Sequence, residues 1–133
     1  MKALCFPLAL ILSSCAGSPA APAPGSLSPS ELIQASHALA GKRVLISGWL
    51  QYERENYSLW DTEREQSTGN AVESCVSVFA PAGLDLGRFH GRYVSATVTF
   101  RDRLPNGIFL GMCNYANVSF DEKSNVRVVA GGG

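Results

Sequence analysis

Alternating apolar and polar positions dominate the chain from residue 42 onward and predict β-strands. In residues 42–53, Val44, Ile46 and Leu50 share one face and Trp49 falls on the other, which is the period of two of a half-buried strand. Gly48 inside this segment predicts a bulge or a sharp coil. Further strands are predicted at residues 57–62, 75–79, 93–101 and 108–120, with a weak last segment at 126–129.

One segment, residues 29–40, has helical spacing instead. Ser28 suits the N-cap, Pro29 the first helical position and Glu31 the carboxylate of a capping box, and Gly41 marks the end. We expect this short helix to plug one end of the β-structure. The polar residues 63–74 contain adjacent glycine and asparagine and are predicted to form a loop.

The N-terminus reads as a segment that is removed. A positive start leads into ten apolar-rich residues that are too short to span a bilayer, followed by Leu12, Ser13, Ser14 and Cys15. This run resembles the lipobox of bacterial lipoproteins. The resemblance implies cleavage before Cys15 and acylation of that cysteine, which gives a signal peptide at 1–14, a lipidated N-terminus and flexible tether at 15–27, and a domain at 28–130.

The predicted tether is rich in proline, alanine and glycine and has no apolar period, so it is expected to be an unstructured spacer. Alanine follows Cys15, and in the lipoprotein family this residue implies the outer membrane, facing the periplasm. Membrane association is expected to come from the N-terminal lipid.

Two later runs, residues 41–50 and 91–96, both place valine three residues after glycine. They resemble strands one and four of oligonucleotide/oligosaccharide-binding (OB) barrels, which lie side by side in that fold. The resemblance covers residues 41–120 and implies a mainly β, small five-stranded OB-like Greek-key barrel with one short N-terminal helix. A glycine- and proline-rich loop stands where that family usually has a helix between strands three and four.

Two cysteines remain once Cys5 leaves with the signal and Cys15 carries lipid, namely Cys75 and Cys113. In an exported protein such a pair is expected to form a disulfide, with two free buried thiols as the alternative. Strands three and five are neighbours in an OB barrel, so a bridge between them is geometrically reasonable. No second cysteine or histidine stands near either one, so no zinc site is predicted.

The charge balance argues against some partners. Without Lys2 the mature chain carries 10 basic and 11 acidic side chains, a formal net charge of −1. This balance provides no long-range attraction for nucleic acid or anionic lipid headgroups.

Catalytic candidates are few. Glu53 and Glu55 are expected to share a strand face, an arrangement that could serve glycoside hydrolysis but that also fits a solvated surface. His37 and His90 are isolated in sequence and predict neither a catalytic triad nor a metal site. No metal and no cofactor is predicted.

A binding face is the more informative candidate. Outward aromatic side chains near strands two and three could stack on a base or a sugar ring, or the helix at 29–40 could pack over them. Two arginines flank Asp102 and could bind an anion or pair with that carboxylate. The candidate face comprises Trp49, Tyr57, Trp60, Phe79, Arg101 and Arg103.

The sequence therefore predicts a lipid-anchored envelope lipoprotein that acts as a binding or scaffolding module for a protein or glycan partner. An OB-type nucleic-acid-binding module and a small envelope hydrolase are the alternatives.

Overall fold

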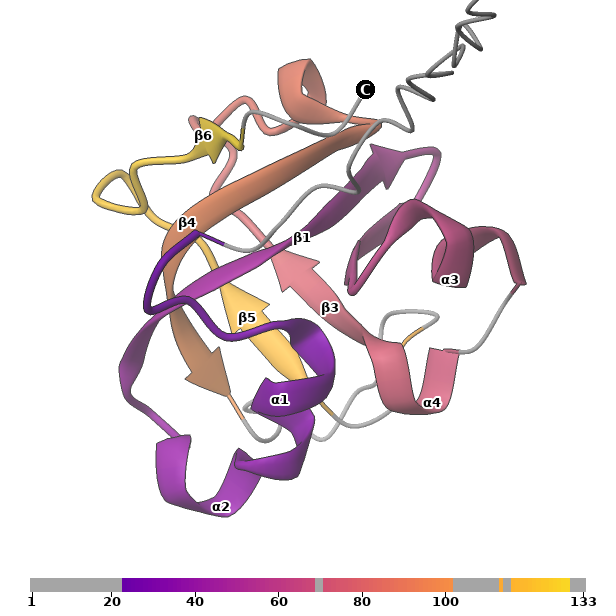
Figure 1. Cartoon of the computed structure of the whole chain (residues 1–133). Helices are drawn as coiled ribbons and strands as arrows, with labels where there is room; N and C mark the ends of the chain where they lie inside the picture. The colour runs from indigo at the N-terminus through magenta and orange to yellow at the C-terminus, as the bar shows by residue number, and fades with distance from the viewer. Residues whose placement is uncertain (1–22, 69–70, 102–112, 114–115, 130–133) are drawn as a thin grey trace, which may run out of the picture.

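A computed structural model describes residues 23–68, 71–101, 113 and 116–129. Five strands close a mixed barrel in the order β1-β2-β3-β5-β4, with β4 pairing back onto β1, and a sixth strand adds to β4 (Figure 1). All pairings are antiparallel except β3 with β5, which is parallel. The strands are β1 (Arg43–Glu53), β2 (Asn56–Trp60), β3 (Cys75–Phe79), β4 (Arg92–Arg101), β5 (Asn117–Ser119) and β6 (Arg127–Val128).

The predicted OB-like barrel is confirmed, including the neighbouring, parallel third and fifth strands. β3 has the predicted bounds, and β6 occupies the weak last segment. The predicted fifth strand, 108–120, is longer than β5, and its residues 108–112 lie outside the described residues.

The helices differ from the prediction in number. The expected helix at 29–40 is two helices, α1 (Pro29–Gln34) and α2 (Ser36–Leu39), because Ala35 leaves helical geometry with ψ near 10°. The capping box is confirmed: Ser28 Oγ accepts a hydrogen bond from the Glu31 N–H (3.3 Å), and Glu31 Oε2 accepts one from the Ser28 N–H (2.8 Å).

The predicted loop at 63–74 is wrong. It contains α3 (Glu63–Thr68) and α4 (Ala71–Ser74). Thr62 provides a physical reason, since its hydroxyl accepts a hydrogen bond from the Glu65 N–H (3.2 Å) and so caps the start of α3. Between β3 and β4 the chain forms only the short 3₁₀ turn η1 (Gly87–Phe89), as the glycine- and proline-rich sequence predicts.

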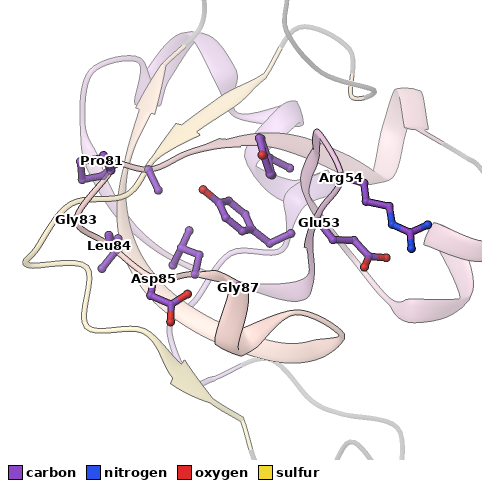
Figure 2. A pocket seen from close by; sticks show the side chains of 12 residues that line it. Glu53, Arg54, Pro81, Gly83, Leu84, Asp85 and Gly87 are labelled. Carbon is purple, nitrogen blue, oxygen red and sulfur yellow. The ribbon is translucent and has the colours of Figure 1, made fainter.

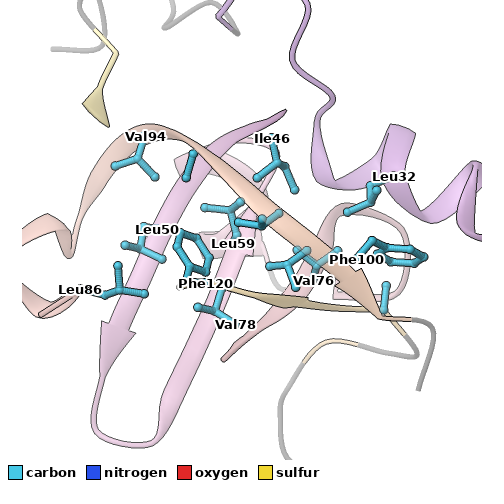
Figure 3. Close-up of a cluster of buried hydrophobic side chains, with 14 residues drawn as sticks. Leu32, Ile46, Leu50, Leu59, Val76, Val78, Leu86, Val94, Phe100 and Phe120 are labelled. Atoms are coloured by element: carbon cyan, nitrogen blue, oxygen red, sulfur yellow. The ribbon is translucent and has the colours of Figure 1, made fainter. Parts of the chain in front are cut away.

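The inward positions of the strands fill the barrel with aliphatic and aromatic side chains. Figure 3 shows Leu32 of α1 at one end of this core and Leu86 of the β3–β4 loop at the other. The helix therefore plugs one end of the barrel, as predicted, and the loop closes part of the opposite end.

Gly48 lets β1 and β2 approach closely at the point where β1 passes from one partner to the other. A Cβ atom there would lie 2.5 Å from the Trp60 carbonyl oxygen and 2.9 Å from Leu59 Cγ. The register between β1 and β4 continues through Gly48 opposite Val94 without a shift, so the predicted bulge is absent at this position. Glycine at this position therefore leaves room for β2 and does not mark an extra, bulged residue.

A second, smaller apolar cluster lies on the outer surface of the barrel. Cross-strand pairing places Trp49 beside Trp60 and Trp60 beside Cys75. Cys75 forms the predicted disulfide with Cys113, with Cα atoms 5.4 Å apart, and both cysteines are buried against the two tryptophans.

The barrel begins before residue 28. Leu27 forms a parallel bridge with Ile46, its N–H donates to the Leu45 carbonyl (2.9 Å), and its carbonyl accepts from the Ser47 N–H (2.9 Å). Residues 23–27, assigned to the tether by the sequence, thus lie against β1. The lipobox and Cys15 lie outside the described residues. No helix among the described residues is long and apolar enough to cross a membrane.

Candidate ligand-binding site

An open cavity of about 470 Å³ lies at the barrel end opposite α1. We call it the mouth pocket. The β1–β2 hairpin forms one side of it and the β3–β4 loop the other (Figure 2). Its volume is in the range of small-molecule sites, about 300 to 1,000 Å³. The lining residues are Tyr52, Glu53, Arg54, Tyr57 and residues 80–87.

Two stacked tyrosines form the aromatic part of the mouth pocket. Tyr52 pairs with Tyr57 across the hairpin, and their ring centroids are 4.4 Å apart with planes inclined at 33°. Tyr52 is half-buried against the core, whereas Tyr57 is 41% exposed. The pair therefore offers a firmly held aromatic surface to solvent.

The hairpin turn beside this pair is conformationally costly. Arg54 and Glu55 both have positive φ, 47° and 68°, a region that residues with a side chain occupy at a cost of about 1 kcal/mol or more each. Positive φ at both central residues is the geometry of a two-residue type I′ turn, whose twist matches that of the flanking strands. The turn also overturns the expectation for Glu53 and Glu55: Glu55 is in the turn and not on the strand, so the two carboxylates do not share a strand face.

The β3–β4 loop holds an exposed carboxylate over the mouth pocket. Leu86 is fully buried in the barrel core and anchors the loop, while its neighbour Asp85 is exposed. A Cβ atom at Gly87 would lie 3.3 Å from Asp85 Oδ1, so glycine at this position leaves room for the carboxylate.

Electrostatics in the mouth pocket favour a neutral Tyr52 phenol, and the lining is negative. Burial raises the pKa of Tyr52, and Tyr57 and the negative charge of Asp85 raise it further. Glu53 and Asp85 against Arg54 give the lining a formal charge of −1. Figure 2 shows Glu53 and Arg54 directed away from the loop that carries Asp85, and Asp85 lines the cavity from that loop.

His90 ties the hairpin to the rest of the barrel. The Tyr52 N–H donates to His90 Nδ1 (3.1 Å), and His90 Nε2 lies 3.5 Å from Glu53 Oε1. Because Nδ1 accepts a hydrogen bond, the imidazole carries its proton on Nε2, facing Glu53. This histidine positions the hairpin, and His37 is exposed on α2 away from the mouth pocket.

The binding face expected from the sequence is divided in the fold. Trp60 is only 1% exposed, its Nε1–H donates to Ser58 Oγ (2.8 Å), and it is not accessible for stacking on a ligand. Trp49 is partly buried beside it. The expected cover by the N-terminal helix is also wrong for this cluster, because the disulfide packs against Trp60 while Leu32 of α1 enters the barrel core.

The remaining members of that face lie elsewhere. Phe79 is partly buried and pairs with Ser119 of β5, and Arg101 is exposed and donates from Nε to Ser119 Oγ (3.2 Å). Arg103 and Asp102 lie outside the described residues. Tyr57 alone reaches the mouth pocket. The sequence interpretation missed Tyr52 and Asp85, although a two-residue turn at residues 54–55 would have paired the tyrosines.

A second cavity of about 470 Å³ lies among α1, α3 and α4. It is lined by acidic side chains, of which Asp61 accepts a hydrogen bond from the Ser30 N–H (2.8 Å) and so holds the start of α1. Within the described ranges, no group of three or more histidine, cysteine, aspartate or glutamate residues is arranged to hold a metal ion.

The fold defines the class of the protein as a small closed β-barrel of OB-like topology with a pocket at one mouth. Comparison with protein-family models, with curated proteins and with solved structures finds no match to this chain.

Proposed function

We propose that this chain is a lipid-anchored protein of the bacterial envelope whose barrel binds a glycan in the mouth pocket. The tether holds the domain near the membrane through acylated Cys15. The barrel then meets envelope glycans at a raised effective concentration, so that modest affinity suffices.

The observation that carries this proposal is the Tyr52–Tyr57 pair at the edge of an open cavity. The face of a sugar ring presents C–H groups, which pack on aromatic rings, while its hydroxyls need polar partners. The two tyrosine hydroxyls and the Asp85 carboxylate supply such partners at the same mouth. The negative lining favours this ligand class over nucleic acid, whose phosphates it would repel.

Two further features support an exported location. The lipobox resemblance at residues 12–15 implies passage across the inner membrane, and the Cys75–Cys113 disulfide is typical of proteins that fold in an oxidising compartment. The divergence of Glu53 and Glu55 removes the carboxylate pair on which the hydrolase alternative depended.

The binding test uses the processed full-length protein extracted in detergent and a tetramer of N-acetylglucosamine, followed by titration calorimetry. We expect binding by the wild type, a loss of about tenfold or more in Tyr57→Ala, and near-wild-type binding in Tyr57→Phe, which keeps the ring. Equal binding by wild type and Tyr57→Ala would show that the ligand does not bind in the mouth pocket. Absence of binding to any neutral or charged oligosaccharide would contradict glycan binding.

The anchor is tested by fractionation and intact-mass measurement. We expect a membrane-bound chain that begins at Cys15 and carries added acyl mass. A Cys15→Ala variant should lose both the acyl mass and the membrane association. An unprocessed wild-type chain in the soluble fraction would contradict the proposed location.

A further inference from the structure

The mouth pocket combines aromatic faces with a carboxylate. Stacking on a sugar ring needs only the aromatic faces, so the carboxylate is an additional feature. The Tyr52 and Tyr57 rings are in tilted contact with centroids 4.4 Å apart, and Asp85 lies on the opposite loop of the same cavity. Aromatic faces carry negative quadrupole potential and attract cations, above all organic ammonium groups. A carboxylate beside them adds a full negative charge and hydrogen-bond acceptors for N–H donors.

The loop that carries Asp85 is anchored in the barrel core. Leu86 fixes the backbone by full burial, and the absent side chain at Gly87 leaves the space that Asp85 Oδ1 occupies. No basic side chain is recorded as an ion-pair partner of Asp85 among the described residues, where the ion pairs involve Arg43 with Asp121 and His90 with Glu53. The negative charge of Asp85 is thus available to a ligand.

The raised pKa of Tyr52 agrees with this field. Burial is the largest cause of the raised pKa of Tyr52, followed by Tyr57 and then by the negative charge of Asp85. Of these causes, the Asp85 charge is the one that would also attract an ammonium group. A carboxylate or phosphate on the ligand would instead meet repulsion.

We propose that the mouth pocket selects a sugar that carries a protonated amine, with the ammonium group held between the Tyr52–Tyr57 pair and the Asp85 carboxylate. This inference rests on the proposed glycan-binding function and narrows its ligand class from sugars in general to amino sugars with a free amine. Asp85 is the specificity-determining residue, while the tyrosine rings serve both kinds of sugar.

Two matched probes distinguish selectivity for amino sugars from glycan binding in general. The N-acetylglucosamine tetramer and the glucosamine tetramer have the same backbone, and only the second carries ammonium groups. Titration of the processed full-length protein at about pH 6, where amines are protonated and carboxyls ionised, compares them directly. We expect the glucosamine tetramer to bind about tenfold more tightly, and the ratio to fall as salt is added.

Asp85→Asn removes the charge and keeps the shape of the side chain, and its position on the surface protects the fold. We expect this variant to lose most of the preference for the glucosamine tetramer, with the tyrosine rings accounting for what remains. Glu63→Gln removes a carboxylate of α3 away from the mouth pocket and should keep the wild-type ratio, which controls for net charge.

Each outcome bears on one of the two proposals. Equal binding of the two tetramers by the wild type overturns the amino-sugar inference and leaves glycan binding intact. A preference that survives undiminished in Asp85→Asn also overturns it, because the selectivity would then not come from this carboxylate. Binding of neither tetramer overturns both, and equally tight binding of a lysine tripeptide overturns the glycan class.

Discussion

At the scale of single residues, small changes in side-chain volume decide whether the strands can meet. Gly48 has the Trp60 carbonyl and the Leu59 side chain directly over its Cα. At Gly87 the neighbouring group is the Asp85 carboxylate. The contact that a Cβ would make there is looser, and it involves a flexible side chain. The two glycines therefore have different tolerances, one set by backbone and the other by a movable group.

Replacing Gly48 with alanine should destabilise the barrel by about 1 to 3 kcal/mol, because the new methyl group meets a backbone oxygen that cannot move without shifting β2. Urea unfolding followed by circular dichroism measures the loss. Gly83→Ala is the matched control, since nothing lies within 4 Å of a Cβ there, and we expect a change of less than about 1 kcal/mol. Equal effects in the two variants would contradict the close approach.

At the scale of elements, the disulfide joins β3 to the chain just before β5 and supports the only parallel pairing among the described strands. Parallel pairs cannot be joined by a tight turn and need a long connection. The cross-link shortens that connection in the unfolded chain, and the tryptophans bury it on the outer face of the barrel.

Removing the disulfide with Cys75→Ala and Cys113→Ala together should lower the free energy of unfolding by about 2 to 4 kcal/mol, since it closes a 38-residue separation. Urea titrations with and without reductant measure this. Reductant should destabilise the wild type and leave the double variant unchanged. If the free energy of unfolding of the wild type stayed the same after its disulfide had been fully reduced, the loop constraint would contribute little to stability.

At the scale of the whole molecule, the barrel is closed by contacts between segments far apart in sequence. Arg43 at the start of β1 pairs with Asp121, which follows β5, and so links the first and later strands. The Arg43 side-chain hydrogen bond, the largest cause, holds the pKa of Asp121 below its usual 3.8. A lowered carboxyl pKa stabilises the fold at neutral pH, and this contribution is lost as the pH falls through the folded-state pKa.

Asp121→Asn should therefore be less stable than the wild type at pH 7, with a difference that narrows between about pH 5 and pH 2. The effect is expected to be small, because the pair is solvent-exposed. Unfolding free energies at a series of pH values give the curve. A difference that stays constant across this range would contradict the assigned cause.

The sequence by itself determined β1, β3 and β4 and their inner faces, because each is one run of alternating side chains whose burial follows locally from a period of two. It also determined the capping box at Ser28 and the pairing of Cys75 with Cys113, since only two cysteines remained in the domain. These are local or combinatorial properties, and neither depends on how the barrel closes.

Only the tertiary structure decided which aromatic side chains are free. Trp60 lies on the outer face of the barrel and is covered by the disulfide. Tyr57 lies on the opposite face of β2, and it is exposed because it stands at the open hairpin end of the barrel. Asp85 reaches the tyrosines only because the barrel brings the β3–β4 loop to the end of the β1–β2 hairpin. Burial and proximity of this kind depend on long-range packing, which no local pattern of residues encodes.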